Sequence, residues 1–131
     1  MSMTSGCDIC FGEDADAAWN NRPKLGRVLD IVAESHFSVR ILQCNACGQK
    51  FVSVFCEEID WSGGNDPQET LLIPVSEMEI AGLIAAGERG VEEALEKLAP
   101  VRRHLVSVFP RTASQSTARF VTGSIFVPRH D

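Results

Sequence analysis

Two pairs of cysteines, each with the spacing CxxC, are the residues of this sequence whose types and spacing could do chemistry. Cys7 and Cys10 stand near the start of the chain, and Cys44 and Cys47 follow after 33 further residues. A CxxC turn brings two thiolates to one ion, and two such turns supply the four sulfurs of a tetrahedral zinc site. Because four sulfurs close the coordination shell and leave no position for water or substrate, the pattern predicts a structural Zn²⁺ rather than a catalytic one.

Three other interpretations of the cysteine pairs stay open. Iron shares the four-cysteine ligand set with zinc. Thiol–disulfide exchange is the second alternative, although a thioredoxin-type motif places its first cysteine at a helix N-terminus, and here the β-type segment QKFVSVF follows the second pair. The third is that the cysteines are buried side chains that bind nothing. Zinc is the interpretation that the paired spacing favours.

The arrangement resembles the zinc-ribbon group of folds, in which two cysteine knuckles at the tips of β-hairpins hold one zinc ion. The resemblance rests on Cys7, Cys10 and the stretch CNACGQKF, which contains Cys44 and Cys47. It covers residues 1–61 only and identifies no specific family. The spacer between the knuckles is longer than the roughly fifteen to twenty residues of the simplest patterns, so an extra strand must fit between them.

The remaining candidates for chemistry favour structural roles. Cys56 stands nine residues after Cys47, in a β-type segment, and is expected to be a core residue. The three histidines, His36, His104 and His130, have no cysteine or carboxylate at a spacing that implies a catalytic dyad, so each is expected at the surface or in a hydrogen bond. No nucleotide-binding loop or nucleophile motif is present. The sequence makes no case for an enzyme.

The elements that must position the cysteines are predicted to be strands. Residues 27–35 and 36–44 are rich in Val, Ile and Phe, and residues 50–61 form another β-type segment. Residues 36–61 are therefore expected to form a hairpin whose tip is the CNACG turn. Gly48, directly after the second cysteine pair, suits the positive φ that such a turn often needs.

The second half of the chain is predicted to contain two short helices. Ser76 and Glu79 have the spacing of a capping box, which marks the start of the first helix, and Gly87 can end it. The second helix is expected to stop at Pro100. Strands are predicted at residues 101–109 and 119–127, the latter with a bulge or turn at Gly123.

Together these elements predict an α+β fold in two parts. Residues 1–61 would form a zinc-ribbon-like antiparallel β lobe. Residues 62–131 would form a small α+β lobe with the two short helices and the C-terminal strands, packed on the first lobe as one compact unit. Zinc would supplement a core that so short a β lobe can hardly build alone.

Charge is distributed unevenly along the chain. The net charge of −6 argues against broad binding to a phosphate backbone. Residues 57–96 carry eleven acidic side chains against one basic one, whereas residues 100–131 carry five arginines against one aspartate. Arginines beside aromatic residues suit docking on an acidic protein surface or stacking on bases, although ordinary strand alternation gives the same pattern. The candidate partner-binding residues are Arg102, Arg103, Arg111, Arg119, Phe120 and Arg129.

The sequence as a whole predicts a non-catalytic, zinc-stabilised binding protein that contacts another macromolecule, with a protein as the expected partner. A nucleic-acid-associated, transcription-type regulator that uses the arginine-rich C-terminal region is one alternative. A CxxC thiol-redox protein is the other. No apolar run approaches the roughly eighteen residues of a membrane span. The start of the chain lacks the basic and apolar regions of a signal peptide, so a cytoplasmic location is expected.

Overall fold

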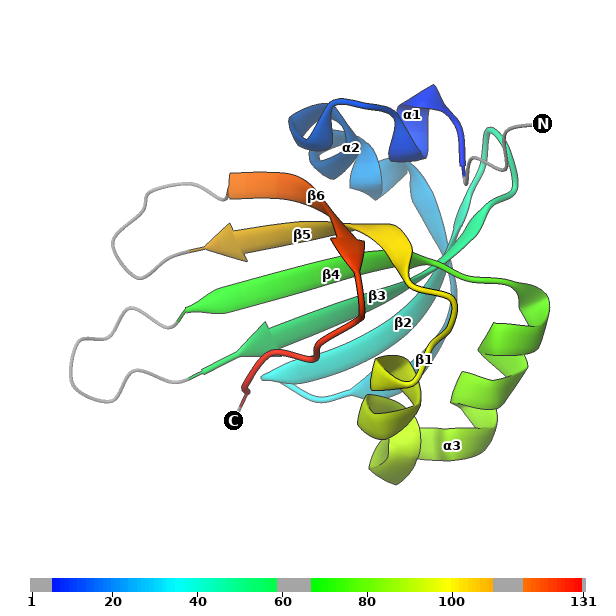
Figure 1. Ribbon diagram of the computed structural model, residues 1–131, viewed down its shortest axis with the longest axis vertical. Helices are drawn as coiled ribbons and strands as arrows, with labels where there is room; N and C mark the ends of the chain where they lie inside the picture. The colour runs from blue at the N-terminus through cyan, green and yellow to red at the C-terminus, as the bar shows by residue number, and fades with distance from the viewer. Residues whose placement is uncertain (1–5, 59–66, 110–116, 131) are drawn as a thin grey trace.

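Six antiparallel strands form the centre of the computed structural model, which describes residues 6–58, 67–109 and 117–130 (Figure 1). The strands are β1 (Leu25–Ala33), β2 (Phe37–Cys44), β3 (Lys50–Glu57), β4 (Gln68–Pro74), β5 (Arg102–Phe109) and β6 (Thr117–Gly123). Each strand pairs with its neighbour in the sequence, in the order β1-β2-β3-β4-β5-β6. The predicted α+β class is confirmed, and so is a hairpin of β2 and β3 whose tip is the CNACG turn. The outgoing strand ends at Glu57, and the last residues of the predicted hairpin, 59–61, lie outside the described residues.

Apolar side chains cover both faces of the sheet, because successive residues of a strand point to opposite sides. On one face, residues such as Val39, Val54 and Ile73 pack under the long helix α3 (Glu77–Glu96). On the other face, Phe51 and Leu72 belong to a second core. The cysteine knuckles lie at this second core, whereas α3 and the first core make up the bulk of the apolar interior.

Helix α3 consists of the two predicted helical segments, which follow each other directly. They meet at Gly87, whose backbone angles are φ 68° and ψ −171°. The predicted capping box starts the first segment: Glu79 N donates to Ser76 Oγ over 3.2 Å, and Ser76 N donates to Glu79 Oε1 over 3.0 Å. The buried side chains of α3 are Ile80, Leu83, Val91 and Leu95. Gly87 thus ends one segment, as predicted, and the next begins without a connecting loop.

Two short helices, α1 (Asp8–Phe11) and α2 (Ala15–Asn21), lie beside β5 and β6 and pack on the second core (Figure 1). No helix was predicted for this acidic stretch. Asp14 caps α2 by accepting hydrogen bonds from the backbone N–H groups of Asp16 and Ala17, at 3.0 and 3.2 Å. A short 3-10 helix (Arg22–Lys24) then leads into β1.

The C-terminal segment after β6 crosses the face of the sheet that α3 covers (Figure 1). The predicted strand over residues 119–127 is wrong in its second half, since β6 ends at Gly123. Ile125 and Val127 are buried in the first core, and Val127 N donates to Glu96 Oε2 over 3.0 Å. Packing against α3 therefore takes the place of strand pairing in this segment.

The two predicted lobes share the central sheet. Strand β3, from the first lobe, pairs with β4, from the second, between Phe51↔Pro74 and Glu57↔Gln68. Because residue 61 lies outside the described residues, the boundary between 1–61 and 62–131 stays a prediction. Within the described part of the chain, no helix combines the length and apolar character that crossing a bilayer requires.

Candidate metal centre

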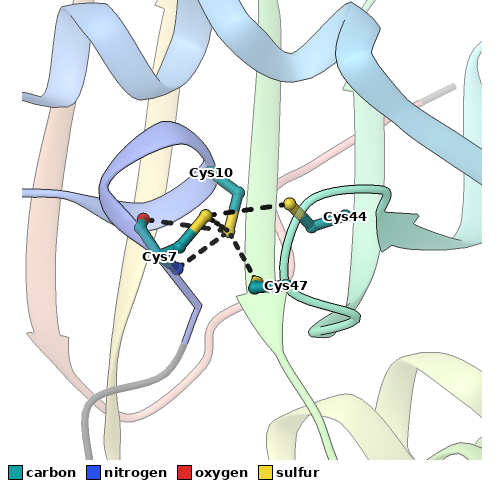
Figure 2. A group of neighbouring side chains, drawn as sticks. All are labelled: Cys7, Cys10, Cys44 and Cys47. Carbon is teal, nitrogen blue, oxygen red and sulfur yellow. Dashed lines mark hydrogen bonds between the residues drawn. The ribbon is translucent and has the colours of Figure 1, made fainter.

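The sulfur atoms of Cys7, Cys10, Cys44 and Cys47 converge on one point, as Figure 2 shows, and all lie within 4.8 Å of one another. Three of the sulfur–sulfur distances are 3.8 Å for Cys7–Cys10, 3.9 Å for Cys7–Cys44 and 3.7 Å for Cys10–Cys47. Two of these join residues that are 37 positions apart in the sequence. The fold thus brings together the four cysteines that the spacing selected.

These distances match a tetrahedral metal centre. Four sulfurs at about 2.3 Å from one ion are separated from one another by about 3.8 Å along the edges of the tetrahedron. The distances of 3.7–3.9 Å are far longer than the roughly 2.05 Å of a disulfide bond. The cluster therefore fits an ion held by four thiolates, and iron fits it as well as zinc, because both use this ligand set.

The second knuckle, at Cys44 and Cys47, lies in the turn between β2 and β3. Cys44 N donates to Gln49 O, and Gly48 N donates to Cys44 O, each over 2.9 Å. Gly48 has a φ of 81°, as predicted, which a residue with a Cβ rarely adopts. Two paired strands hold the ends of this turn, so both sulfurs are carried by a rigid hairpin.

The first knuckle differs from that of a zinc ribbon, because it lies on a short helix rather than at the tip of a hairpin. Cys7 is the N-cap of α1 and Cys10 lies in its single turn. Cys7 N donates to Cys10 Sγ over 3.3 Å, and Phe11 N donates to Cys7 O over 2.8 Å. The helical turn directs both thiols to the same side, toward the second knuckle (Figure 2).

Gln49 joins the two knuckles, a role that no pattern in the sequence predicted. Its Oε1 accepts a hydrogen bond from Gly6 N over 3.2 Å, immediately before the first cysteine. Its Nε2 donates to Lys50 O over 2.8 Å, on the strand that leaves the second knuckle. The side chain thus fixes the approach of one knuckle to the other without contributing a ligand.

Arg103, on β5, holds the first knuckle against the sheet. Its Nη1 donates to Phe11 O over 3.2 Å and its Nη2 donates to Gly12 O, at the end of α1. The guanidinium lies 3.5 Å from the ring centroid of Phe120 and 4.7 Å from that of Phe11. A positive charge at the carbonyl end of a helix is favourable, and stacking on two aromatic rings adds to this.

The surroundings shift the pKa values of three cysteines of the cluster in different directions. Hydrogen bonds from backbone N–H groups, first that of Cys10 and then that of Ile9, lower the pKa of Cys7 to about 7. Burial raises the pKa of Cys10, and burial also raises that of Cys47, against a hydrogen bond from the backbone of Gln49. A cation at the centre would stabilise all four thiolates, so metal binding would release protons from this cluster.

Cys56 takes no part in the cluster. It is 1% exposed and belongs to the core under α3, so its predicted role as a core residue is confirmed. Burial, with smaller contributions from the charges of Glu92 and Glu69, raises its pKa to about 12. A thiol in this environment stays protonated and unreactive at neutral pH.

The candidate partner-binding residues do not form one group. Arg102 is used within the chain, where it donates to both carboxylate oxygens of Glu79, at 2.7 and 2.6 Å. Phe120 packs on Phe11 at the first knuckle, with the ring centroids 4.9 Å apart. Arg119 lies on β6, Arg129 is 88% exposed, and Arg111 lies outside the described residues. Partner binding by these residues, Arg103 included, stays a prediction.

The histidines make hydrogen bonds, as expected. His104 is buried, and its Nδ1 lies 3.0 Å from Arg102 O. His36 and His130 pair with Glu57 and Glu92 respectively, and these carboxylates are too distant in sequence for spacing to have suggested them.

Comparisons of the chain with models of protein families, with curated proteins and with solved structures give no match.

Proposed function

We propose that this protein is a non-catalytic binding protein whose N-terminal segment is fastened to its sheet by a structural zinc ion. The observation that supports this best is the set of sulfur–sulfur distances of 3.7–3.9 Å among residues from two distant knuckles. Cys7, Cys10, Cys44 and Cys47 would be the ligands. Four thiolates complete a tetrahedral shell, which suits stabilisation rather than chemistry on a substrate.

The contribution of zinc would be to cross-link the start of the chain to the β2–β3 hairpin. Segment 6–12 forms only one turn of helix, and so short a helix is not stable by itself. Phe11 and Arg103 give it some tertiary support. Binding of a metal that requires both knuckles adds its binding free energy to the stability of the fold.

The expected partner is another protein. The net charge of −6 disfavours a nucleic acid. On the described surface, Phe126 is 76% exposed. Phe126 and Arg129 line one hollow together. Exposed aromatic and arginine side chains are the residue types that supply binding free energy in protein interfaces.

Metal analysis of protein purified without added zinc tests the structural part of this proposal. We expect one zinc per chain and a melting temperature that falls when a strong chelator removes it. A metal-free protein with reversible disulfides among these cysteines would instead support the thiol-redox alternative. Salt-sensitive binding to nucleic acid that weakens on replacement of Arg119 would support the regulator alternative.

A further inference from the structure

A polar hollow lies on the face of the sheet opposite α3, at the part that α1 and α2 leave open. Its volume is about 590 Å³, which is within the range of small-molecule sites. The hollow lies between α2, the β1–β2 turn and the central strands β2, β3 and β4. Its lining includes Arg22, Arg40, Ser38, Ser53, Thr70 and Phe55.

The hollow exists because small polar residues replace large apolar ones on this part of the sheet. Ser38 pairs in register with Phe55, which pairs with Thr70, while Arg40 pairs with Ser53. On the same face, Leu72 pairs in register with Ser53 and Phe51 lies two residues before Ser53, and both belong to the core that α1 and α2 cover. The hydroxyls of Ser38, Ser53 and Thr70 make no hydrogen bond to any described residue. Three hydroxyl donors thus line the hollow without a partner in the described part of the chain.

Arg40 lines the hollow and carries a nitrogen that makes no hydrogen bond within the described part of the chain. Its Nε is buried and makes no hydrogen bond to the described residues. This nitrogen lies 3.3 Å from Asp30 Oδ1, so the two groups form an ion pair, but the N–H does not point at the carboxylate. The side chain as a whole is 40% exposed and lines the hollow, so the other N–H groups of the guanidinium are open to an oxygen of a ligand.

Arg22 supplies a second positive charge to the same hollow. Its guanidinium lies 3.6 Å from the ring centroid of Trp19, and its Nη1 donates to Trp19 O over 2.8 Å. These contacts fix the side chain in place and leave its other N–H groups available. Two guanidiniums and several hydroxyls are the donors that recognise an oxyanion.

Two carboxylates near the guanidiniums would repel a large anion with several charges. Glu34 lines the hollow and Asp30 pairs with Arg40. A nucleic acid or another polyanion would meet both carboxylates, whereas a small ligand with one charged group would contact the guanidiniums and leave the carboxylates to solvent.

We propose that this hollow binds a small organic molecule with one anionic oxygen group, a carboxylate or a phosphate monoester. Arg40 and Arg22 contact the anionic group. Ser38, Ser53 and Thr70 form hydrogen bonds with its polar remainder, and Phe55 provides apolar contact. The site does not involve the cysteine cluster, so it stands whether or not the chain holds zinc.

Nuclear magnetic resonance titration of the isotope-labelled full-length protein, as purified, tests the proposal with two probes, inorganic phosphate and benzoate. We expect saturable shifts of the Arg40 Nε–H signal and of the backbone amides of Ser38, Ser53 and Thr70. The dissociation constant should be about 1 mM or tighter for at least one probe. Saturation by phosphate alone assigns a phosphate monoester to the site, and saturation by benzoate alone assigns a carboxylate.

Three variants separate binding at the hollow from general effects of charge. Arg40→Gln and Arg22→Gln should each weaken binding at least tenfold. Arg27→Gln is the matched control, because Arg27 also pairs with Asp30, at 3.8 Å, but does not line the hollow. Absence of saturable shifts with either probe would overturn the proposal. So would binding that is equally strong in Arg40→Gln and in the native protein.

Discussion

Cys44 and Cys56 lie on the same hairpin, are both buried, and are expected to have different roles. Cys44 is 4% exposed and its sulfur lies 3.9 Å from that of Cys7, whereas Cys56 is 1% exposed and packs among apolar side chains under α3. The difference comes from what surrounds each thiol, not from how deeply it is buried. Substitutions at these two positions therefore distinguish a metal ligand from a core residue.

Cys44→Ser should abolish stoichiometric zinc and lower the melting temperature sharply, because a hydroxyl is a poor replacement for a thiolate ligand. Cys56→Ala should retain one zinc per chain and cost about 1–3 kcal/mol of stability through lost packing. Zinc content and thermal unfolding of the two variants check this. Full zinc occupancy in Cys44→Ser would contradict the ligand assignment.

Arg103 positions the first knuckle, and its effect should appear in metal affinity. Arg103→Lys keeps the charge but cannot donate in the same geometry to two carbonyls and stack on two rings. Loss of such a supporting contact is expected to weaken metal binding about 10–100-fold. Competition with a chromophoric chelator measures this. Arg119→Lys, on the neighbouring strand β6, is the control and should bind metal as tightly as the native chain.

At the scale of elements, α3 shows how local sequence signals produce its two segments. The capping box at Ser76 and Glu79 starts the helix, and Gly87 interrupts it with a backbone conformation that is essentially restricted to glycine. The interruption lets both segments place apolar side chains on the sheet, at Leu83 before it and Val91 after it.

Two glycines of α3 should respond oppositely to alanine. Gly87→Ala should destabilise the protein by about 1–3 kcal/mol, because a Cβ is strained at φ 68° even though the space around it is open. Gly82→Ala should stabilise it by about 0.5–1 kcal/mol, because alanine is the better helix former and a Cβ there meets nothing within 4 Å. Denaturant unfolding measures both. Equal effects would contradict the interruption at Gly87.

The contact between α3 and β5 predicts a specific acid sensitivity. Hydrogen bonds from Arg102 lower the pKa of Glu79 below its usual 4.5. Because the folded-state pKa is depressed, the stabilisation is complete above the pKa of the unfolded state and is lost as pH falls through the folded value. Glu79→Gln should cost about 1–3 kcal/mol at neutral pH and less at pH values well below 4.5.

Stability measured against pH for the native chain and Glu79→Gln checks this sign. Glu93→Gln is the matched control, because Glu93 pairs with Lys97 on the same helix but both side chains are exposed. It should change the pH profile little. A Glu79→Gln profile parallel to that of the native chain would contradict the predicted acid sensitivity.

At the scale of the whole molecule, local signals were readable from the sequence and long-range contacts were not. The CxxC spacing identified Cys7, Cys10, Cys44 and Cys47, and β-type patterning placed the second pair at a hairpin tip. Arg103 was predicted only as a candidate partner-binding residue, because its contact with Phe11 joins residues 92 positions apart. No periodicity or spacing rule reports a contact of that kind.

For helix α2 and for the segment after β6, local sequence patterns pointed to more than one structure. Asp14 is a recognisable N-cap before the helix-forming residues of α2, but the acidic composition of the stretch masked it. Apolar alternation at Ile125 and Val127 is typical of a strand, but burial against α3 produces the same pattern without pairing. The secondary structure of such segments depends on tertiary packing, which local sequence patterns do not predict.

In the proposed metal centre, the sulfurs of Cys7, Cys10, Cys44 and Cys47 hold one zinc ion. X-ray absorption spectroscopy at the zinc edge of protein purified without added metal would detect this coordination. We expect one zinc per chain with four sulfur ligands at about 2.3 Å and no nitrogen or oxygen bound to the metal. A protein that contains no metal, or a zinc bound mainly by nitrogen and oxygen, would contradict the claim.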